Sequence, residues 1–488
     1  MADSYLGIDL GSTSVKAAVF DQYGNCLSRF FERYSTLRPA ANRAEQNPDD
    51  WMHLIRQALA QFEAEGLGGR VGFGCLCSHV NTHVFVDKSG KALGPAILWQ
   101  DLRAAPEGTE LDAQLTLADK IRLLGSPTPV DASHPLARML WMARHQPEIW
   151  RQTAYVLLPK DYCILKMTGV LATDPLSNVG LVGPDLGYVK SIVDLVPGAA
   201  RRIASLVGLT DTVGQVKAEY GLSGLQMVTG TMDGWVGLFG GGAGQLGEMV
   251  YLSGTSEILG VSSTTISGEP GIVVFPEVSG LRIHAGPTQS GGASQMWFCD
   301  VAGLEVDDLI ARVAGAHRRI PTPLFLPQLS GERAPLWNSN LRGAFLGLDS
   351  GMATEDLARA VLEGVALSAR HVLAALSASS GISAETLKCG GGGFRSDPWG
   401  QIRADVLDKR LTRLEVNEPG LVGAVAIAAY GSGDHSSLSS AHANFARYDK
   451  EWVPNHENRG LYDDLFGIYL DAIAANDALG RRITKLHV

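Results

Sequence analysis

Two segments about 240 residues apart share one layout, and this layout constrains the fold more than any other feature. The first is "LGIDLGSTSVKAAVFD" (6–21) and the second is "MVYLSGTSEILGVS" (249–262). Each has an apolar run, a turn of glycine and hydroxyl residues, and a second apolar run, the pattern of two strands joined by a turn. A strand–hydroxyl turn–strand therefore stands at the head of each half of the chain as a short internal repeat.

The length of 488 residues also predicts more than one core. Two domains, each on the order of 200 residues, are the natural expectation. A dense glycine cluster over 237–247 suits the crossing between them, because glycine accepts the backbone changes of a hinge. We therefore expect domains over 1–243 and 244–488, with the last helix, near 458–476, packing back across the domains.

Local periodicity indicates an α/β chain throughout. The predicted strands are at 5–20, 25–31, 71–77, 83–87 and 249–262, and the predicted helices are at 48–64, 135–145, 354–377, 397–408 and 423–431. Segments 102–125 and 183–225 are expected to be helix-rich insertions around this framework.

Charge and composition exclude several classes of protein. Lys and Arg number 41 against 51 Asp and Glu, a net charge of −10, which argues against a broad nucleic-acid surface. We see no apolar run near the roughly 18 to 20 residues of a membrane span and no basic leader at the N-terminus. The six cysteines form no disulfide framework, so we expect reduced thiols and a cytoplasmic location.

The two hydroxyl turns have two interpretations. Gly11, Ser12 and Thr13 present backbone N–H groups and hydroxyls that suit phosphate oxygens, and Gly254 and Thr255 repeat the arrangement. Either turn alone would be read as an ordinary hairpin turn. Two of them, each heading one half, favour two lobes that close on one polyphosphate. Neither is a Walker A motif or a G-x-G-x-x-G motif.

Two aspartates stand in apolar surroundings, where an ionised carboxylate is costly without a partner. Asp9 is either paired with a buried donor such as Lys16 or an outer ligand of Mg²⁺, reached through water. Asp233 follows a strand in a glycine-rich segment. It suits a general base for a substrate hydroxyl, a role typically worth about 10²–10⁴ in rate, although it could equally cap the following helix.

Two further motifs are ambiguous by themselves. "CLCSHVNTHVFVD" (75–87) suggests a zinc site, but same-face residues of a strand are about 6.5 Å apart and would need a turn to gather them. We favour a substrate cleft at the strand end, with His79 and Asn81 as polar contacts. "GGGGFRSDPWGQIRAD" (390–405) is either a nucleotide-binding approach to a helix capped near Ser396 or a plain glycine-rich turn.

Several longer motifs resemble those of the FGGY carbohydrate kinases, over essentially the whole chain. "SHPLARMLWMARH" (133–145) resembles the first family signature, with Arg138 where the pattern has Lys, and "GAFLGLDSGMATEDLARAVLE" (343–363) fits the second. "AILWQDLRA" (96–104), "VLLPKDYCILKMTG" (156–169) and "FLPQLSGERAPLWN" (325–338) are most similar to xylulose kinases. The resemblance implies two actin/hexokinase/Hsp70-like (ribonuclease H-like) ATPase domains around a deep cleft, with ATP held mainly by the second.

The resemblance also assigns roles residue by residue. Asp9 matches the metal-associated aspartate and Asp233 the catalytic base, which also contacts the metal and the sugar. Trp99 matches a residue that packs against the sugar. The residues that match nucleotide contacts are Gly11, Ser12 and Thr13 of the first phosphate hairpin, Gly254, Thr255 and Gly292 at the phosphates, and Gly392, Gly393 and Ser396 at the adenosine.

Departures from the xylulose kinase pattern fall on the sugar side. Those kinases carry Gln-Met-His where this chain has His79-Val80-Asn81, and Asn where it has Gly234. Glycerol kinases carry Gln-Arg-Glu at the first of these sites, which disfavours glycerol. A site built to bond a hydroxyl discriminates strongly, so such changes can redirect specificity.

These observations predict ATP- and Mg²⁺-dependent phosphorylation of a terminal hydroxyl on a small ketose or polyol. D-xylulose, giving D-xylulose 5-phosphate, is the first candidate; L-xylulose, ribulose and a tetritol are alternatives. A non-kinase actin-like ATPase is the alternative from another class. The expected partners are the sugar or polyol and ATP, without nucleic acid or membrane, and relatives suggest a homodimer.

Overall fold

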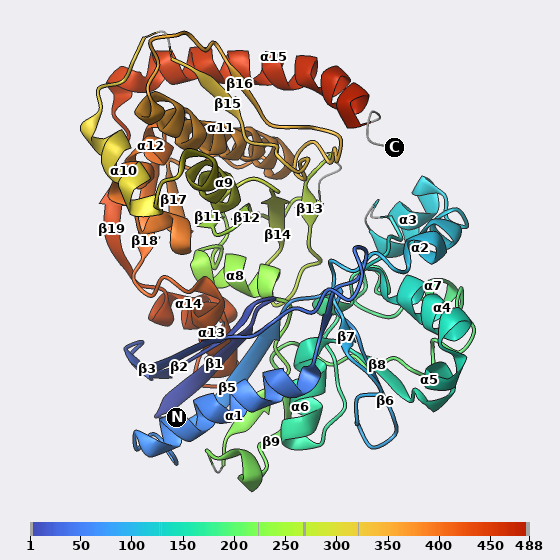
Figure 1. Cartoon of the computed structure of the whole chain (residues 1–488). Coiled ribbons are helices and arrows are strands. Elements are labelled where there is room, and N and C mark those ends of the chain that lie inside the picture. Colours follow the sequence, from blue (N-terminus) through green and yellow to red (C-terminus); the bar gives the residue numbers. More distant parts are fainter. Residues whose placement is uncertain are drawn as a thin grey trace. The chain divides into compact units, whose positions relative to one another are not determined.

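The computed structural model describes residues 3–484 except 126, 128, 223, 267–269 and 321. Its chain forms two compact units, which are coloured along the sequence in Figure 1. Unit 1 comprises Met1–Gly240 and Gly420–Phe445, and unit 2 comprises Gly241–Pro419 and Ala446–Val488. The predicted ranges of 1–243 and 244–488 differ from this division chiefly in residues 420–445, which return to unit 1.

Unit 1 is built on a six-stranded sheet of order β3-β2-β1-β5-β10-β9. Its strands are β1 (Ser4–Leu10), β2 (Ser14–Asp21), β3 (Cys26–Arg33), β5 (Val71–Ser78), β9 (Thr212–Gln215) and β10 (Gln226–Val228), with short outlying strands β4 (Glu45–Gln46), β6 (Val84–Val86), β7 (Ala96–Ile97) and β8 (Tyr155–Leu157). Its helices are α1 (Pro48–Ala64), α2 (Ala105–Asp112), α3 (Leu117–Leu124), α4 (Pro135–His145), α5 (Pro147–Gln152), α6 (Pro159–Thr168), α7 (Lys190–Val193), α8 (Asp233–Gly241), α13 (Pro419–Gly431) and α14 (Leu438–Phe445), with 3-10 turns η1 (Leu176–Asn178) and η2 (Ala218–Tyr220).

Unit 2 is built on a seven-stranded sheet of order β13-β14-β12-β11-β17-β18-β19. Its strands are β11 (Met249–Ser253), β12 (Glu257–Ser262), β13 (Val273–Val274), β14 (Ile283–Pro287), β17 (Thr386–Gly390), β18 (Arg410–Leu414) and β19 (Tyr448–Trp452), with the separate pair β15 (Leu324–Leu326) and β16 (Ala344–Leu346). Its helices are α9 (Gly292–Ala302), α10 (Val306–Gly315), α11 (Thr354–Ser380), α12 (Asp397–Leu407) and α15 (Arg459–Thr484), with 3-10 turns η3 (Gly392–Phe394) and η4 (His456–Asn458).

The two sheets share one topology, as the repeat in the sequence suggests. The run β3-β2-β1-β5-β10-β9 has two antiparallel pairings, two parallel pairings and a final antiparallel pairing. The run β14-β12-β11-β17-β18-β19 has the same succession. Each hydroxyl turn joins two neighbouring inner strands of its own sheet, β1 to β2 and β11 to β12, so the two turns lie at equivalent places in their sheets.

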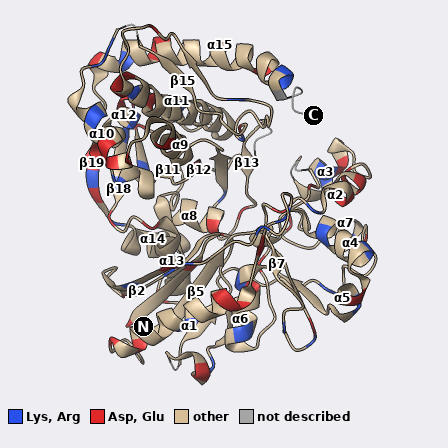
Figure 2. Ribbon diagram, in the orientation of Figure 1, with Lys and Arg blue, Asp and Glu red and all other residues tan. Residues whose placement is uncertain are grey.

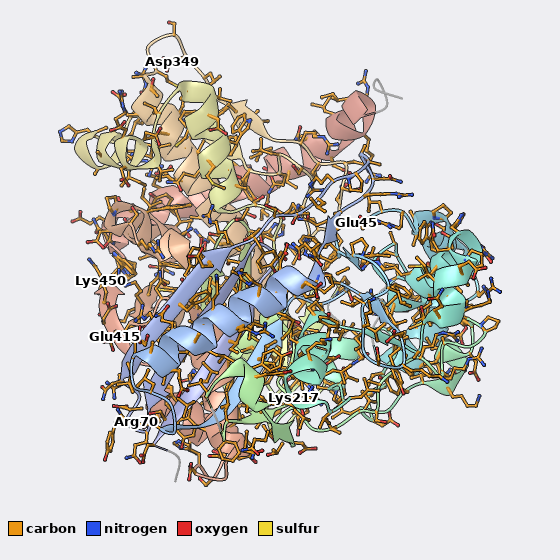
Figure 3. The ribbon with its side chains drawn as sticks, turned by 60° about the horizontal axis from the view of Figure 1, so that its bottom comes forward. Glu45, Arg70, Lys217, Asp349, Glu415 and Lys450 are labelled. Carbon is orange, nitrogen blue, oxygen red and sulfur yellow. The ribbon has the colours of Figure 1, made fainter. Side chains whose placement is uncertain are left out.

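Strand β1 is buried on both faces, and its alternation determines what each side chain meets. Leu6, Ile8 and Leu10 join the core that contains α1 side chains such as Trp51 and Ile55. Figure 3 shows α1 lying across this part of the sheet. The opposite face of β1 meets the segment 420–445, because Gly7 comes so close to α13 that a Cβ atom there would lie 2.8 Å from a helix carbonyl.

One expectation from the sequence is wrong in detail. Segment 183–225 is not helix-rich: it holds the four-residue α7, the 3-10 turn η2 and strand β9, because positive-φ glycines such as Gly198, Gly214 and Gly221 interrupt it. The packing of the last helix across the domains stays a prediction; α15 itself is part of unit 2 and packs on α12 and β15 there.

Helix α11 has the length and apolarity of a membrane span, although no such run was expected. Of its most apolar window, however, 72% is buried inside the structure, as in the core helix of a globular domain. Charged residues of both signs are interspersed over the outer helices in Figure 2. All six cysteines are free.

Candidate functional site

Asp233 is the first residue of α8 and directly follows Met232, which forms a strand-like parallel bridge with Ser78 of β5. Its Oδ1 accepts a hydrogen bond of 2.7 Å from the N–H of Gly234. The carboxylate is partly open at the surface but closely surrounded. Desolvation, and then the nearby charge of Asp9, raise its pKa to about 7. A carboxylate that titrates near neutrality suits a general base.

Asp9 lies on the face of β1 that meets α13, close to the first turn of that helix. A Cβ atom on Gly420 would lie 2.7 Å from its Oδ2, and the thiol of Cys77 contacts its Oδ1 at 3.7 Å. The exposed N–H groups of a helix start stabilise an anion. Lys16 stands opposite Asp9 in the strand register. Asp9 therefore has favourable surroundings before any ligand arrives.

The β1–β2 turn is held by its carbonyl oxygens. The hydroxyl of Tyr34 donates to Gly11 O, and its N–H donates to Thr13 O at 3.2 Å. The side-chain amide of Gln46 donates to Ser12 O at 2.7 Å. These bonds turn the carbonyl oxygens, which would repel phosphate, toward protein donors. Tyr34 and Gln46 thus fix the predicted phosphate turn through hydrogen bonds to its carbonyl oxygens.

The three residues predicted to contact the sugar differ in their exposure. Trp99 is half-buried, and its indole N–H donates to the Ser12 hydroxyl at 3.0 Å, which links it to the hydroxyl turn. Asn81 is also half-buried and has a left-handed φ of 55°, which asparagine tolerates better than most residues. His79 is only 2% exposed, with Nδ1 3.0 Å from Leu10 O.

His79 is therefore more deeply buried than Asn81 and Trp99. Burial lowers the pKa of its imidazole to about 4, so the ring is neutral at pH 7. The backbone N–H of His79 also donates to Leu10 O at 3.1 Å, and this bond links the end of β5 to the end of β1. The nearby Cys75 and Cys77 are buried, the Cys77 thiol donates to Ile8 O at 3.5 Å, and His83 is bonded by Arg138.

In unit 2, the structure brings all six predicted nucleotide residues to one recess of about 730 Å³, a size typical of small-molecule sites. They are Gly254, Thr255, Gly292, Gly392, Gly393 and Ser396. Ser396 caps α12 by accepting the N–H of Trp399 at 3.4 Å. The first turn of α9 bonds the β11–β12 turn, with Gly292 N–H to Gly254 O at 2.9 Å. Two helix starts thus open on this recess.

Close backbone approach requires glycine at this recess. A Cβ atom on Gly393 would lie 2.1 Å from the Ser253 hydroxyl, and one on Gly292 would lie 2.7 Å from Gly254 O. The glycine run therefore does more than make a turn, because it lets the 390–393 loop lie against the end of β11.

Buried Arg403 joins the two loops of the recess. It donates to Gly393 O at 2.6 Å, and its other terminal nitrogen donates to the Ser253 hydroxyl and to Glu257 Oε1, each at 2.7 Å. Glu257 also accepts the hydroxyl of Tyr251 at 2.6 Å. This network fixes the loop after β17 against the turn after β11.

Sequence reasoning missed several of these supporting residues. Glu257 and Arg403 lie inside the quoted motifs. A charged residue of each sign within these largely uncharged stretches was a signal that could have been used. Tyr34, Gln46 and Gly420 carried no local signal, because their roles depend on contacts between distant segments.

The two carboxylates of unit 1 fit a magnesium ion better than a metal held wholly by protein. After desolvation, the charge of Asp9 is the next cause of the raised pKa of Asp233, so the two carboxylates lie close enough to interact. Within the described part of the chain, no group of three His, Cys, Asp or Glu side chains is placed to hold a metal. Mg²⁺ typically takes one or two carboxylates, keeps several waters and binds substrate phosphates.

Comparison with known proteins gives full-length matches. Residues 4–240 match the N-terminal domain of the FGGY family of carbohydrate kinases, and residues 199–432 match its C-terminal domain. The chain is 30% identical to the xylulose kinase of Bacillus subtilis (strain 168), over 95% of each chain. It is 28% identical to the xylulose kinase of Lactococcus lactis subsp. lactis (strain IL1403), over 99% of each.

Solved structures share the fold. A gluconate kinase from Lactobacillus acidophilus superposes with a TM-score of 0.88 at 22% identity, covering 98% of this chain and 99% of that one. A xylulose kinase from Rhodospirillum rubrum has a TM-score of 0.86 at 24% identity, covering 98% and 100%.

Proposed function

Because the chain belongs to the FGGY family of carbohydrate kinases, we propose that it phosphorylates a terminal hydroxyl of a small ketose, with D-xylulose as the first candidate. Its class is established by the family: an ATP-dependent phosphotransferase with an alcohol acceptor and the two-domain, actin/hexokinase-like fold. The alternative of a non-kinase actin-like ATPase is set aside, since relatives named as kinases match nearly the whole chain.

The observation that carries the proposed mechanism is the carboxylate of Asp233, whose pKa of about 7 leaves it able to take a proton at neutral pH. The hydroxyl oxygen of the sugar forms a bond to the γ-phosphorus of ATP as its proton passes to Asp233. The bond from that phosphorus to the β,γ-bridging oxygen breaks, and ADP leaves. Positioning and charge neutralisation supply most of the remaining acceleration.

Asp9 and Asp233 would hold Mg²⁺ in this scheme, directly or through water. The ion supplies neutralisation of the phosphate charge when it is bound. The β1–β2 turn would offer the N–H groups and hydroxyls of Ser12 and Thr13 to phosphate oxygens, because its carbonyls are bonded elsewhere. The N–H of Gly11 donates to Ser14 O at 3.0 Å, so Gly11 would contribute close backbone approach.

The nucleotide would occupy the recess of unit 2. Gly254, Thr255 and Gly292 would contact its phosphates at the start of α9. The N–H groups of Gly292 and Ala293 bond the β11–β12 turn, so the helix start would favour an anion through the positive end of its dipole. Gly392, Gly393 and Ser396 would contact the adenosine. Arg403 would keep the two sets of contacts in register by bonding both loops.

The sugar is proposed on the names of the relatives and on the match of Trp99, while Asn81 departs from the pattern of those relatives. A coupled ADP-release assay against D-xylulose, L-xylulose, D-ribulose, a tetritol, glycerol and gluconate tests it directly. We expect the highest kcat/KM with D-xylulose. Gluconate is included because relatives of both kinds match. A preference of at least about tenfold for any other member would overturn D-xylulose, and no turnover with any member would overturn the kinase proposal for small sugars.

A further inference from the structure

Arg138 of α4 is a charged side chain with 0% exposure. Removing a cation from water is costly unless strong partners replace its hydration. Its five hydrogen bonds nevertheless go to neutral acceptors, four of them backbone carbonyls. Desolvation lowers the pKa of its guanidinium to about 9, which still leaves it charged at pH 7.

The acceptors of Arg138 lie on two segments that carry predicted sugar contacts. One terminal nitrogen donates to Asn81 O and to Ile97 O, the latter at 2.6 Å. The other terminal nitrogen donates to Leu98 O, next to Trp99. The planar fork of one guanidinium therefore bonds both segments at once.

These segments also bond each other. His83 and Ile97 exchange two backbone hydrogen bonds of 3.0 Å, and the N–H of Trp99 donates to the Thr82 hydroxyl at 3.2 Å. Asn81 has a left-handed backbone, and its carbonyl is bonded by Arg138. A change at Arg138 would move the backbone of Asn81 and Trp99 together.

We propose that Arg138 is a positioning residue that sets which sugar the enzyme accepts, by fixing Asn81 and Trp99 in one arrangement. This rests on the proposed function. Lysine, which stands here in the family pattern, has a single nitrogen with three donors. It cannot reach the carbonyls at 81, 97 and 98 together with that of Ala132, which Arg138 bonds through Nε at 3.2 Å. Arg138 thus holds these four carbonyls in one arrangement, which a lysine at this position could not do.

A purely structural role is the competing explanation, and Arg202 provides a matched control. It is 6% exposed, lies in unit 1 and also donates to backbone carbonyls, those of Thr153, Gly198 and Trp150, at 2.9–3.0 Å. The variants Arg138→Lys and Arg202→Lys both keep the charge and lose the fork. Both are expected to lower the Tm.

The measurements are KM for the sugar and for ATP, the ratio of kcat/KM between the two best sugars of the panel, and sugar binding without ATP by calorimetry. For Arg138→Lys we expect sugar KM and Kd to rise by about tenfold or more, as loss of one or two fixed contacts would give. The sugar ratio should also change, while KM for ATP stays within about twofold. Arg202→Lys should leave all four values within about twofold of wild type.

Two results separate the proposals. Equal effects of the two variants on sugar KM and on the sugar ratio would overturn the positioning role while leaving the kinase assignment intact. A wild-type enzyme that turns over no member of the panel would instead remove the proposed function. If Arg138→Lys fails to fold, Thr82→Ala loosens the same segment by removing the acceptor of the Trp99 N–H, and unchanged sugar selectivity there would equally contradict the inference.

Discussion

Asp233 shows how a reactive group costs stability. Its pKa of about 7 in the folded protein lies above the ordinary value of 3.8. Between these two values the folded state binds a proton that the unfolded state has lost. Stability is therefore highest below pH 4 as far as this group is concerned, and it falls as pH rises toward 7. The same property makes the carboxylate a competent base.

The substitution Asp233→Asn is expected to raise the Tm at pH 8 and to leave it nearly unchanged at pH 4. The shift of about three pKa units limits the gain in unfolding free energy to about 4 kcal/mol, less for partial solvation. Scanning calorimetry at both pH values measures it. An equal Tm change at both would show that the carboxylate titrates normally.

The same pKa predicts the pH dependence of activity. In the wild-type enzyme kcat/KM for the sugar should rise with pH as Asp233 ionises, with a midpoint at or below about 7, because bound Mg²⁺ would favour the charged carboxylate. Asp233→Asn should lower kcat by at least about 10²-fold at every pH, since the base is gone. Near-wild-type turnover by that variant would disprove the assignment of the base.

At the scale of elements, the decisive contact is between β1 and α13. Tyr5, Gly7 and Asp9 alternate on one face of the strand, and each meets the segment 420–445: the Tyr5 hydroxyl bonds Asp434 at 2.6 Å, Gly7 approaches Leu421, and Asp9 approaches Gly420. Every second side chain of β1 therefore faces the segment 420–445, and the carboxylate of Asp9 lies at the start of α13.

Gly420→Ala tests this contact. The added methyl would lie 2.7 Å from Asp9 Oδ2, and overpacking of this kind typically costs about 1–3 kcal/mol. If Asp9 moves to relieve it, kcat should fall by roughly 5- to 100-fold. Gly467→Ala is the control, because Gly467 lies within α15 with nothing inside 4 Å of an added Cβ; it should gain up to about 1 kcal/mol and keep full activity. Wild-type kcat in Gly420→Ala would show that Asp9 tolerates the displacement.

The elements also show what a sequence can and cannot predict. The helices at 48–64 and 135–145 and both strand–turn–strand segments carry local signals, such as Pro48 at a helix start and the glycines of the turns, and they match the structure. The fold class is confirmed by the solved relatives. The partner of Asp9 could not be predicted, because Gly420 is 411 residues away (420 − 9) and glycine has many other uses.

At the scale of the whole molecule, the chain leaves unit 1 after residue 240 and returns to it for residues 420–445. The returning segment is a core component: Leu421, Val422, Val425 and Ile427 of α13 are at most 2% exposed. Each such side chain contributes about 1.5–3 kcal/mol when buried. Together they rival the total stability of an ordinary domain, about 5–15 kcal/mol.

A fragment of residues 1–240 is therefore expected to be insoluble or unfolded. A chimera that joins 420–445 to residue 240 through a short glycine-serine linker should fold, because an added Cβ on Gly423 would lie only 3.2 Å from the N atom of Gly240. Solubility, circular dichroism and a cooperative thermal transition compare the two. A cooperative transition in the 1–240 fragment would mean that the returning helices are dispensable.

The interruption of unit 1 also bears on how the nascent chain folds during translation. After residue 240 a ribosome must add 205 residues (445 − 240) before the last part of this unit exists, which takes roughly 10–40 s at about 5–20 residues per second. Through that interval the α13-facing side of β1 has nothing to cover it. Slow synthesis of the intervening stretch should therefore increase the dependence of this protein on holdase chaperones.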